Sequence, residues 1–287
     1  PIDTSHVPPI NYFTHGPTLA YRTFGSGPLH VLAFHGFGRS GADFEVLEPS
    51  LKNLLTIHAF DLHFHGKSPG YPERANTPFT PKELADYFAS FADRIGATRV
   101  GLLGYSLGGR IALSLAEQMP QRLDVVLLAA PDGLHTRPWY RRLAASSFGR
   151  ALYRRFVMDP SLIHALIKTM RALRLMNERM FRFLMGQTDS RAKRELVRDV
   201  WLSYRLIEPD LHKVAANAVE HNVPVHLFFG TYDKVIKAHQ GANLHSLAPN
   251  MITQTELPLG HALLTAELGA AMRDRLLHDR KINTVPG

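Results

Sequence analysis

The chain contains no cysteine among its 287 residues. This absence excludes disulfide bonds, thiolate nucleophiles and metal sites built on thiolates. Long apolar runs are also missing: the longest uninterrupted one, residues 125–131, is far shorter than the roughly 20 residues of a membrane-spanning helix. No signal-peptide pattern precedes the first strand-like segment, and low-complexity tracts and internal repeats are absent. We therefore expect a soluble, cytoplasmic protein with a packed core.

Basic residues outnumber acidic ones in one part of the chain. The formal net charge is +8, and residues 134–215 contain 14 Arg and 3 Lys against 7 Asp and Glu, which gives +10 there and −2 elsewhere. Because the excess is confined to this segment and no nucleic-acid-binding motif accompanies it, we do not expect nucleic acid as a partner. Most of these arginines are interpreted as a solvated face. Two sharper alternatives are peripheral contact with anionic lipid and a clamp on a substrate carboxylate or phosphate.

Short apolar runs alternate with helical patterns over the rest of the chain. The runs are too continuously apolar for a sheet with one wet face, so we expect helices on both faces. The alternation predicts an α/β fold with a mostly parallel, doubly wound sheet, whose ligands lie beyond the carboxyl ends of the strands. The predicted strands are residues 21–24, 30–34, 54–60, 100–103, 125–129, 225–229 and 251–257, and the predicted helices are residues 81–95, 107–119 and 261–277.

One segment interrupts this alternation. Residues 134–215 have helical patterns rich in Arg, Leu and Met, in which Leu162, Ile163, Leu166 and Ile167 recur at helical spacing. We interpret the segment as an inserted, all-helical cap. Residues 1–133 and 216–287 then form the core domain.

The most informative motif is Gly104-Tyr105-Ser106-Leu107-Gly108, which has the G-x-S-x-G spacing of a nucleophile elbow. It lies between a predicted strand and a predicted helix. A serine on such a turn has a strained backbone, and glycines two residues before and after it relieve collisions with neighbouring chain. The next N–H group, that of Leu107, lies at a helix N-terminus and is suited to stabilise an oxyanion. The pattern predicts Ser106 as a nucleophile.

A serine hydroxyl needs a base to take its proton and a carboxylate to orient that base. Asp233 follows the strand at 225–229, and His261 follows the strand at 251–257. The chain order is then nucleophile, acid, base, as expected for this kind of elbow. Asp132, after the strand at 125–129, is an alternative acid, and Asp233 is preferred because its loop fits that order better.

Together these motifs resemble the α/β-hydrolase fold superfamily over nearly the whole chain outside the cap. The segment His35-Gly36-Phe37-Gly38 looks like the oxyanion loop of that family, with His35 as a residue that shapes the loop. Residues 60–68 look like its D-x-x-G-H-G-x-S turn, with His63-Phe64 where Pro-Gly or similar is usual. The resemblance implies backbone oxyanion donors at Phe37 and Leu107.

The resemblance implies further roles. Ser106 is the implied nucleophile, His261 the base and later the acid, and Asp233 its orienting carboxylate. The implied activity is a serine hydrolase that cleaves a carboxylic ester or related small acyl substrate through an acyl-enzyme, with Arg110 and Tyr105 as candidate substrate-binding residues.

Two alternatives stay open at this stage. The elbow together with Arg110 is similar to that of the menaquinone-pathway SHCHC synthase, a cofactor-free lyase that eliminates pyruvate from a carboxylated substrate. A non-catalytic small-molecule receptor on the same fold is the alternative from another class.

The sequence predicts neither a metal nor another cofactor. His58, Asp61, His63 and His65 have metal-capable side chains, but the turn that contains most of them is explained by the fold. No second ligand cluster is evident in the sequence.

Overall fold

In the computed structural model, which describes residues 8–135 and 146–283, eight strands form one sheet. The order is β1-β2-β4-β3-β5-β6-β7-β8; β2 runs antiparallel to β1 and β4, and every other neighbouring pair is parallel. All six residues of β5 and of β7 are buried, so both faces of the sheet are covered, and the predicted α/β class is confirmed. The strands are β1 (Asn11–Thr14), β2 (Thr18–Phe24), β3 (Leu29–Phe34), β4 (Leu55–Phe60), β5 (Val100–Tyr105), β6 (Leu123–Ala129), β7 (Val225–Gly230) and β8 (Ile252–Leu257).

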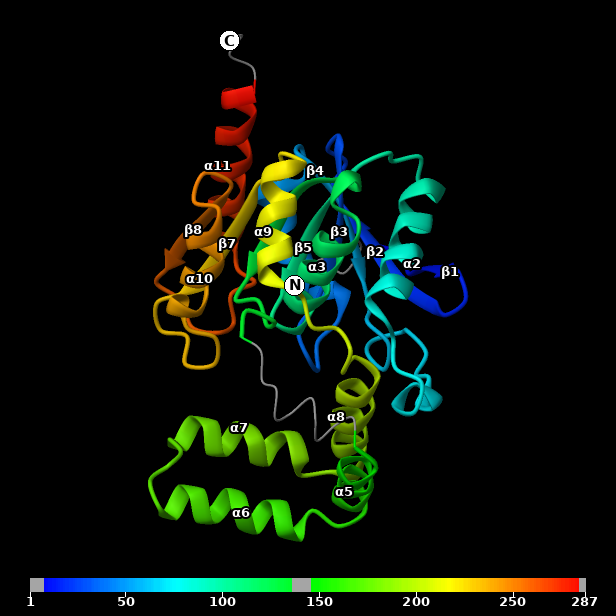
Figure 1. Cartoon of the computed structure of the whole chain (residues 1–287), viewed down its shortest axis with the longest axis vertical. Helices are drawn as coiled ribbons and strands as arrows, with labels where there is room; N and C mark the ends of the chain where they lie inside the picture. The colour runs from blue at the N-terminus through cyan, green and yellow to red at the C-terminus, as the bar shows by residue number, and fades with distance from the viewer. Residues whose placement is uncertain (1–7, 136–145, 284–287) are drawn as a thin grey trace, which may run out of the picture. The chain divides into compact units, whose positions relative to one another are not determined.

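The helices that cover the sheet form two groups. In one group, α2 contacts α3, α3 contacts α9, and α9 contacts α10. Figure 1 shows α3 and α9 in front of the strands. Helix α1 packs against α11. These helices are α1 (Glu48–Leu51), α2 (Pro81–Arg94), α3 (Leu107–Gln118), α9 (Leu211–Glu220), α10 (Ala242–Leu247) and α11 (Ala266–Asn283), with 3₁₀ turns η2 (Gly41–Leu47), η4 (Pro120–Arg122) and η5 (Ala238–Gln240).

The chain divides into two compact units. The core unit comprises Pro1–Pro69, Pro81–Thr136 and Ile207–Gly287, and the helical unit comprises Gly70–Thr80 and Arg137–Leu206. The segment expected as a cap was 134–215, so the helical unit adds a stretch before α2 and ends earlier. It ends earlier because α9 packs against α3 and α10 and thereby belongs to the core unit.

The described part of the helical unit consists of helices and turns. Helices α6 and α7 lie side by side, and α8 packs against α5, α7 and η3. The buried Arg194 joins three of them: its Nε donates to the Val157 carbonyl at 3.1 Å and its Nη1 to the Thr188 carbonyl at 3.0 Å. This basic residue therefore links α5, α7 and α8. The elements are η3 (Pro72–Ala75), α5 (Ser147–Met158), α6 (Ser161–Ala172), α7 (Glu178–Thr188) and α8 (Arg191–Ser203).

Several elements differ from the sequence-based prediction, and the short helices α1 and α10 are among those that were not predicted. The predicted helix at 261–277 begins at Ala266 instead, because the Thr265 hydroxyl accepts the N–H of Leu268 at 3.4 Å and caps the helix there. His261 consequently lies in a loop. The edge strand β1 was not predicted, since only one of its four residues is buried and an apolar run does not reveal it.

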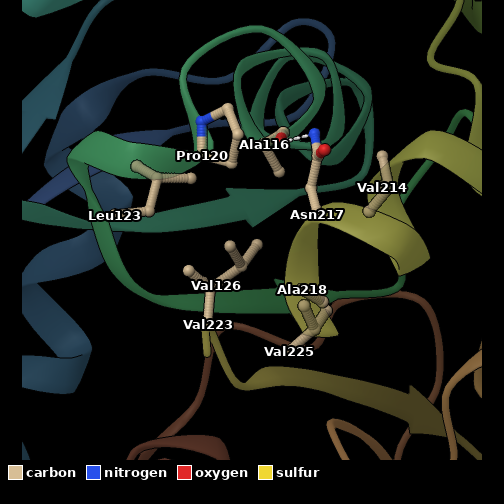
Figure 2. A pocket seen from close by; sticks show the side chains of 9 residues that line it. All are labelled: Ala116, Pro120, Leu123, Val126, Val214, Asn217, Ala218, Val223 and Val225. Carbon is tan, nitrogen blue, oxygen red and sulfur yellow. Dashed lines mark hydrogen bonds between the residues drawn. The ribbon is translucent and has the colours of Figure 1, made fainter. Parts of the chain in front are cut away.

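A small apolar cavity lies between α3, α9 and the sheet (Figure 2). Its volume of about 10 Å³ leaves room for one water molecule at most. Pro120, Leu123 and Val225 place it near the amino ends of β6 and β7, the opposite edge of the sheet from Ser106. We therefore do not consider it a substrate site. Its lining residues are Ala116, Pro120, Leu123, Val126, Val214, Asn217, Ala218, Val223 and Val225.

The turn after β4 is organised by the buried carboxylate of Asp61. One carboxylate oxygen accepts the N–H of Gly41 at 2.7 Å, and the other accepts the N–H of Lys67 at 2.7 Å. The Ser68 hydroxyl donates to the Asp61 carbonyl at 2.5 Å and accepts the N–H of Ala20 at 2.8 Å. The turn is thus fixed to β2 and to η2 on either side.

The close approach of Gly66 to Asp61 gives a stability prediction. Gly66 has φ +54°, and a Cβ there would lie 2.1 Å from the Asp61 Oδ2. Gly96 has φ +73° with open space around it, so it is the matched control. Left-handed strain alone costs roughly 1–2 kcal/mol, and displacing the carboxylate from its amide partners adds roughly 1–3 kcal/mol. Urea unfolding should show a clearly larger loss for Gly66→Ala than for Gly96→Ala, and equal losses would contradict the role given to this turn.

Candidate active site

Ser106 connects β5 to α3 with a backbone conformation that side-chain-bearing residues rarely adopt, φ 51° and ψ −116°. Three main-chain hydrogen bonds hold it there. Its N–H donates to the Ala129 carbonyl at 3.1 Å, and its carbonyl accepts the N–H groups of Gly109 at 2.9 Å and Asp132 at 2.8 Å. The surroundings therefore fix the strained residue, as they do at functional turns.

The glycines around Ser106 are required by the close packing of the elbow. A Cβ on Gly104 would lie 2.6 Å from the Gly109 Cα, and a Cβ on Gly108 would lie 1.9 Å from the Phe34 carbonyl oxygen. Helix α3 thus starts in direct contact with β3. The G-x-S-x-G spacing has the steric cause expected from the sequence.

Ser106, His261 and Asp233 form a continuous hydrogen-bonded chain. The Ser106 Oγ lies 3.3 Å from the His261 Nε2, and the His261 Nδ1 lies 2.8 Å from the Asp233 Oδ2. The other carboxylate oxygen of Asp233 accepts the N–H groups of Val235 at 2.7 Å and Ile236 at 3.0 Å. Because the buried carboxylate only accepts, the Nδ1 carries the imidazole proton and the Nε2 is left to accept the serine proton.

The alternative acid, Asp132, has other partners. Its Oδ2 lies 2.7 Å from the Arg110 Nη2, and its Oδ1 accepts the N–H of Gly133 at 2.8 Å. The structure therefore brings Asp233, and not Asp132, to His261. It also gives the guanidinium of Arg110 a carboxylate partner within the protein.

The two segments that contain the predicted oxyanion donors adjoin Ser106. Leu107 is the first residue of α3, and the N–H groups of a first helical turn have no acceptor within the helix. The loop that contains Phe37 lies against the elbow, since a Cβ on Gly36 would be 3.2 Å from the Ser106 Cβ. The arrangement is suited to a negatively charged oxygen bound beside Ser106.

Two buried histidines hold this loop. The His35 Nδ1 donates to the Gly36 carbonyl at 2.7 Å, and its Nε2 accepts the N–H of Leu62 at 2.9 Å. The His65 Nε2 accepts the N–H of Gly38 at 3.0 Å, and its Nδ1 donates to the His63 carbonyl at 3.0 Å. Both rings must be neutral, because each Nε2 is an acceptor.

The loop-shaping role predicted for His35 agrees with these bonds. The matching role of His65 was missed, although its position in the turn at 60–68 was recognised. Burial, and then the neighbouring His65, lower the pKa of His35 to about 3, and burial lowers the pKa of His65.

Tyr105 contacts the base from the residue before the nucleophile. Its hydroxyl donates to the His261 carbonyl at 2.8 Å, and the two rings are 5.7 Å apart. Burial raises the pKa of Tyr105 to about 12, so the phenol keeps its proton as a donor. This bond positions the His261 loop; contact of Tyr105 or Arg110 with a substrate stays a prediction.

Buried histidines should make the core unit sensitive to acid. Burial lowers the pKa of His35 to about 3 and that of His58 to about 4, from the 6.5 of an exposed imidazole. As the pH falls below 6.5 the unfolded chain therefore binds protons first. Stability present above pH 6.5 is lost down to about pH 4 for His58 and down to about pH 3 for His35. Between pH 7 and pH 5 each histidine should lower the free energy of unfolding by about 2 kcal/mol. Urea titrations at these pH values measure the loss, and His35→Gln should reduce the slope; an unchanged slope would refute the assignment.

The chain is similar to known proteins in fold and, over part of its length, in sequence. A thermophilic esterase from Thermogutta terrifontis, solved with malate bound, is similar with a TM-score of 0.68 over 94% of this chain and 98% of that one, at 19% identity. That likeness concerns the fold alone. The pimeloyl-[acyl-carrier protein] methyl ester esterase of Proteus mirabilis is 31% identical over 112 residues, which cover 39% of this chain and 40% of the esterase.

An uncharacterized protein from Mycobacterium tuberculosis is 30% identical over 130 residues, or 45% of this chain. The match spans only 37% of that relative's length. The sequence model of the alpha/beta hydrolase fold matches residues 30–265, a span that includes Ser106, Asp233 and His261. By this match and by its sheet topology, the chain belongs to the alpha/beta hydrolase fold family.

Proposed function

We propose that this protein is a serine hydrolase that cleaves a carboxylic ester or related acyl compound. The observation that carries the proposal is the hydrogen-bonded chain from the Ser106 hydroxyl through His261 to the buried Asp233. The protein belongs to the alpha/beta hydrolase fold family and is similar to a methyl ester esterase, and both facts support a hydrolase.

The first half of the reaction forms an acyl-enzyme. The Ser106 Oγ attacks the carbonyl carbon while its proton passes to the His261 Nε2, and Asp233 stabilises the resulting imidazolium. The carbonyl oxygen becomes an oxyanion that accepts hydrogen bonds from the N–H groups of Leu107 and Phe37, each contributing roughly 3 kcal/mol to transition-state stabilisation. When the intermediate collapses, His261 gives its proton to the leaving alcohol.

The second half releases the acid. A water molecule gives a proton to the His261 Nε2 and attacks the acyl carbon, forming a second oxyanion at the same donors. The bond to the Ser106 Oγ then breaks, and His261 returns its proton to that oxygen. The 3.3 Å between the serine and histidine atoms is the loose contact that such pairs show without substrate.

The lyase alternative receives less support. It depends on Arg110 as a binder of a substrate carboxylate, and the guanidinium is already 2.7 Å from the Asp132 carboxylate. A substrate carboxylate would have to compete with that ion pair, which is largely buried at 15% exposure for Arg110. Hydrolysis needs no such rearrangement.

Substitution of the nucleophile tests the proposal directly. Ser106→Ala should abolish labelling by a fluorophosphonate probe and lower the turnover of p-nitrophenyl esters by about 10⁴-fold or more. Ser90→Ala is the matched control, because the Ser90 Oγ also lies 3.3 Å from a histidine nitrogen, that of His15. Labelling retained in Ser106→Ala, or lost in Ser90→Ala, would refute the assignment.

A second pair of variants identifies the acid. Asp233→Asn should lower kcat by about 10⁴-fold, because an amide favours the wrong imidazole tautomer. Asp132→Asn leaves the His261 contact intact and should stay within about tenfold of the unchanged enzyme. Steady-state kinetics on one p-nitrophenyl ester compares the two, and the reverse order of losses would reassign the acid to Asp132.

A further inference from the structure

Helix α6 of the helical unit has apolar side chains on two faces. One face packs within the unit: Ile167 is buried, Ile163 and Met170 are partly buried, and the His164 Nε2 lies 2.9 Å from the Thr188 Oγ1 of α7. This contact accounts for one face of the helix. At 3.6 residues per turn, the remaining apolar side chains of α6 lie roughly 90° around the helix from this face, and α7 does not account for them.

The other face is exposed. Leu162 and Leu166 are 59% and 55% exposed, and Leu173, one residue past the helix end, is 64% exposed. Positions four and eleven residues apart lie on one side of a helix, so these three leucines form a line, here named the outer stripe. Met158 before the helix and Leu175 after it are exposed as well. Apolar exposure of this extent marks a contact surface.

The stretch of chain that contains the outer stripe has a net charge of one sign. Residues 147–188 contain seven Arg and one Lys against two acidic residues, a net charge of +6. Of the two acids, Glu178 lies 3.0 Å from Arg171 and 3.7 Å from Arg182, and the Asp159 carboxylate accepts the N–H of Ser161. Exposed cations include Arg154, Arg155, Lys168, Arg171 and Arg174.

The exposed leucines and the positive charge together indicate which partner fits this surface. A second copy of the chain would bring +6 against +6, which disfavours self-association. Nucleic acid would match the charge and leave the leucines in water. An anionic lipid surface satisfies both features, since leucines enter the interfacial region while Lys and Arg bind headgroup phosphates.

We propose that the outer stripe of α6 and the exposed cations of residues 147–188 dock this protein on the surface of anionic membranes. The helix lies along the surface: its 12 residues extend about 18 Å, and the hydrocarbon core is about 30 Å thick. Within the described part of the chain, no helix has the length and apolar character needed to span a bilayer. This role is independent of the proposed ester hydrolysis.

Vesicle co-sedimentation of the full chain tests the proposal without any ester substrate. The protein should sediment with vesicles of 30% phosphatidylglycerol in phosphatidylcholine and remain in solution with pure phosphatidylcholine vesicles. Leu162→Ser/Leu166→Ser should lower the partition coefficient at least about tenfold, given the apolar area lost. The control is Val219→Ser/Tyr12→Ser, because these core-unit residues have nearly the same exposure, 59% and 54%.

A double substitution that removes two positive charges tests the electrostatic part of the proposal. Arg155→Gln/Lys168→Gln should weaken binding about tenfold or more, since each basic residue near an anionic surface contributes about 1 kcal/mol. Lys52→Gln/Arg273→Gln removes two exposed cations of the core unit and should leave binding unchanged. Because all four side chains are exposed, these variants are expected to fold, and circular dichroism checks this for every variant.

Three outcomes would overturn the proposal. One is equal binding to neutral and anionic vesicles, and another is an equal loss in the test and control variants. The third is absence of vesicle binding together with a dimer, seen by light scattering, that the stripe variant dissociates; the stripe would then be a self-association surface. Since none of these measurements uses Ser106 chemistry, failure here leaves the proposed hydrolase activity untouched, and the reverse also holds.

Discussion

The strained backbone at Ser106 is the constraint on which the candidate site depends. A residue with φ 51° stays there only because the neighbouring main chain holds it with three hydrogen bonds. Those bonds come from β6, from α3 and from the segment after β6, so the elbow is fixed by elements that are separate in sequence. The elbow also requires glycine at positions 104 and 108, because the absence of side chains there lets α3 start against β3. The direction of the serine hydroxyl follows from these contacts.

Around the elbow, burial determines which polar groups carry charge. Asp61 and Asp233 are buried carboxylates whose oxygens accept main-chain N–H groups, which compensates for their removal from water. His35 and His65 are buried without a carboxylate partner of their own and serve as neutral acceptors instead. Cationic side chains are concentrated in the helical unit, and most of those whose burial the structure describes are exposed. The core unit thus keeps its site polar with little net charge of either sign.

Local patterns in the sequence predicted much of the core unit and part of the site. The buried strands and the elbow were predictable because apolar runs and the glycine spacing are local signals. The sequence favoured Asp233 over Asp132 only by the order of nucleophile, acid and base, since both acids follow buried strands. The structure adds the contacts: Asp233 reaches His261, and Asp132 meets Arg110. The contact of His65 with Gly38 likewise joins two loops 27 residues apart. On α6, helical spacing identified the leucines and isoleucines together, and only the packing against α7 distinguishes the buried face from the exposed one.

The hydrogen bond from Tyr105 to the His261 carbonyl has a mechanical consequence. Tyr105 is the last residue of β5 and the immediate neighbour of Ser106, while His261 belongs to a loop that follows β8, at the far edge of the sheet. A twist or shear of the sheet would separate two groups attached only to their own strands. Through this phenol, the loop of the base is tied to the strand of the nucleophile, so thermal motion of the sheet moves the two together. The distance between the Ser106 hydroxyl and the His261 imidazole therefore changes less when the strands between them move.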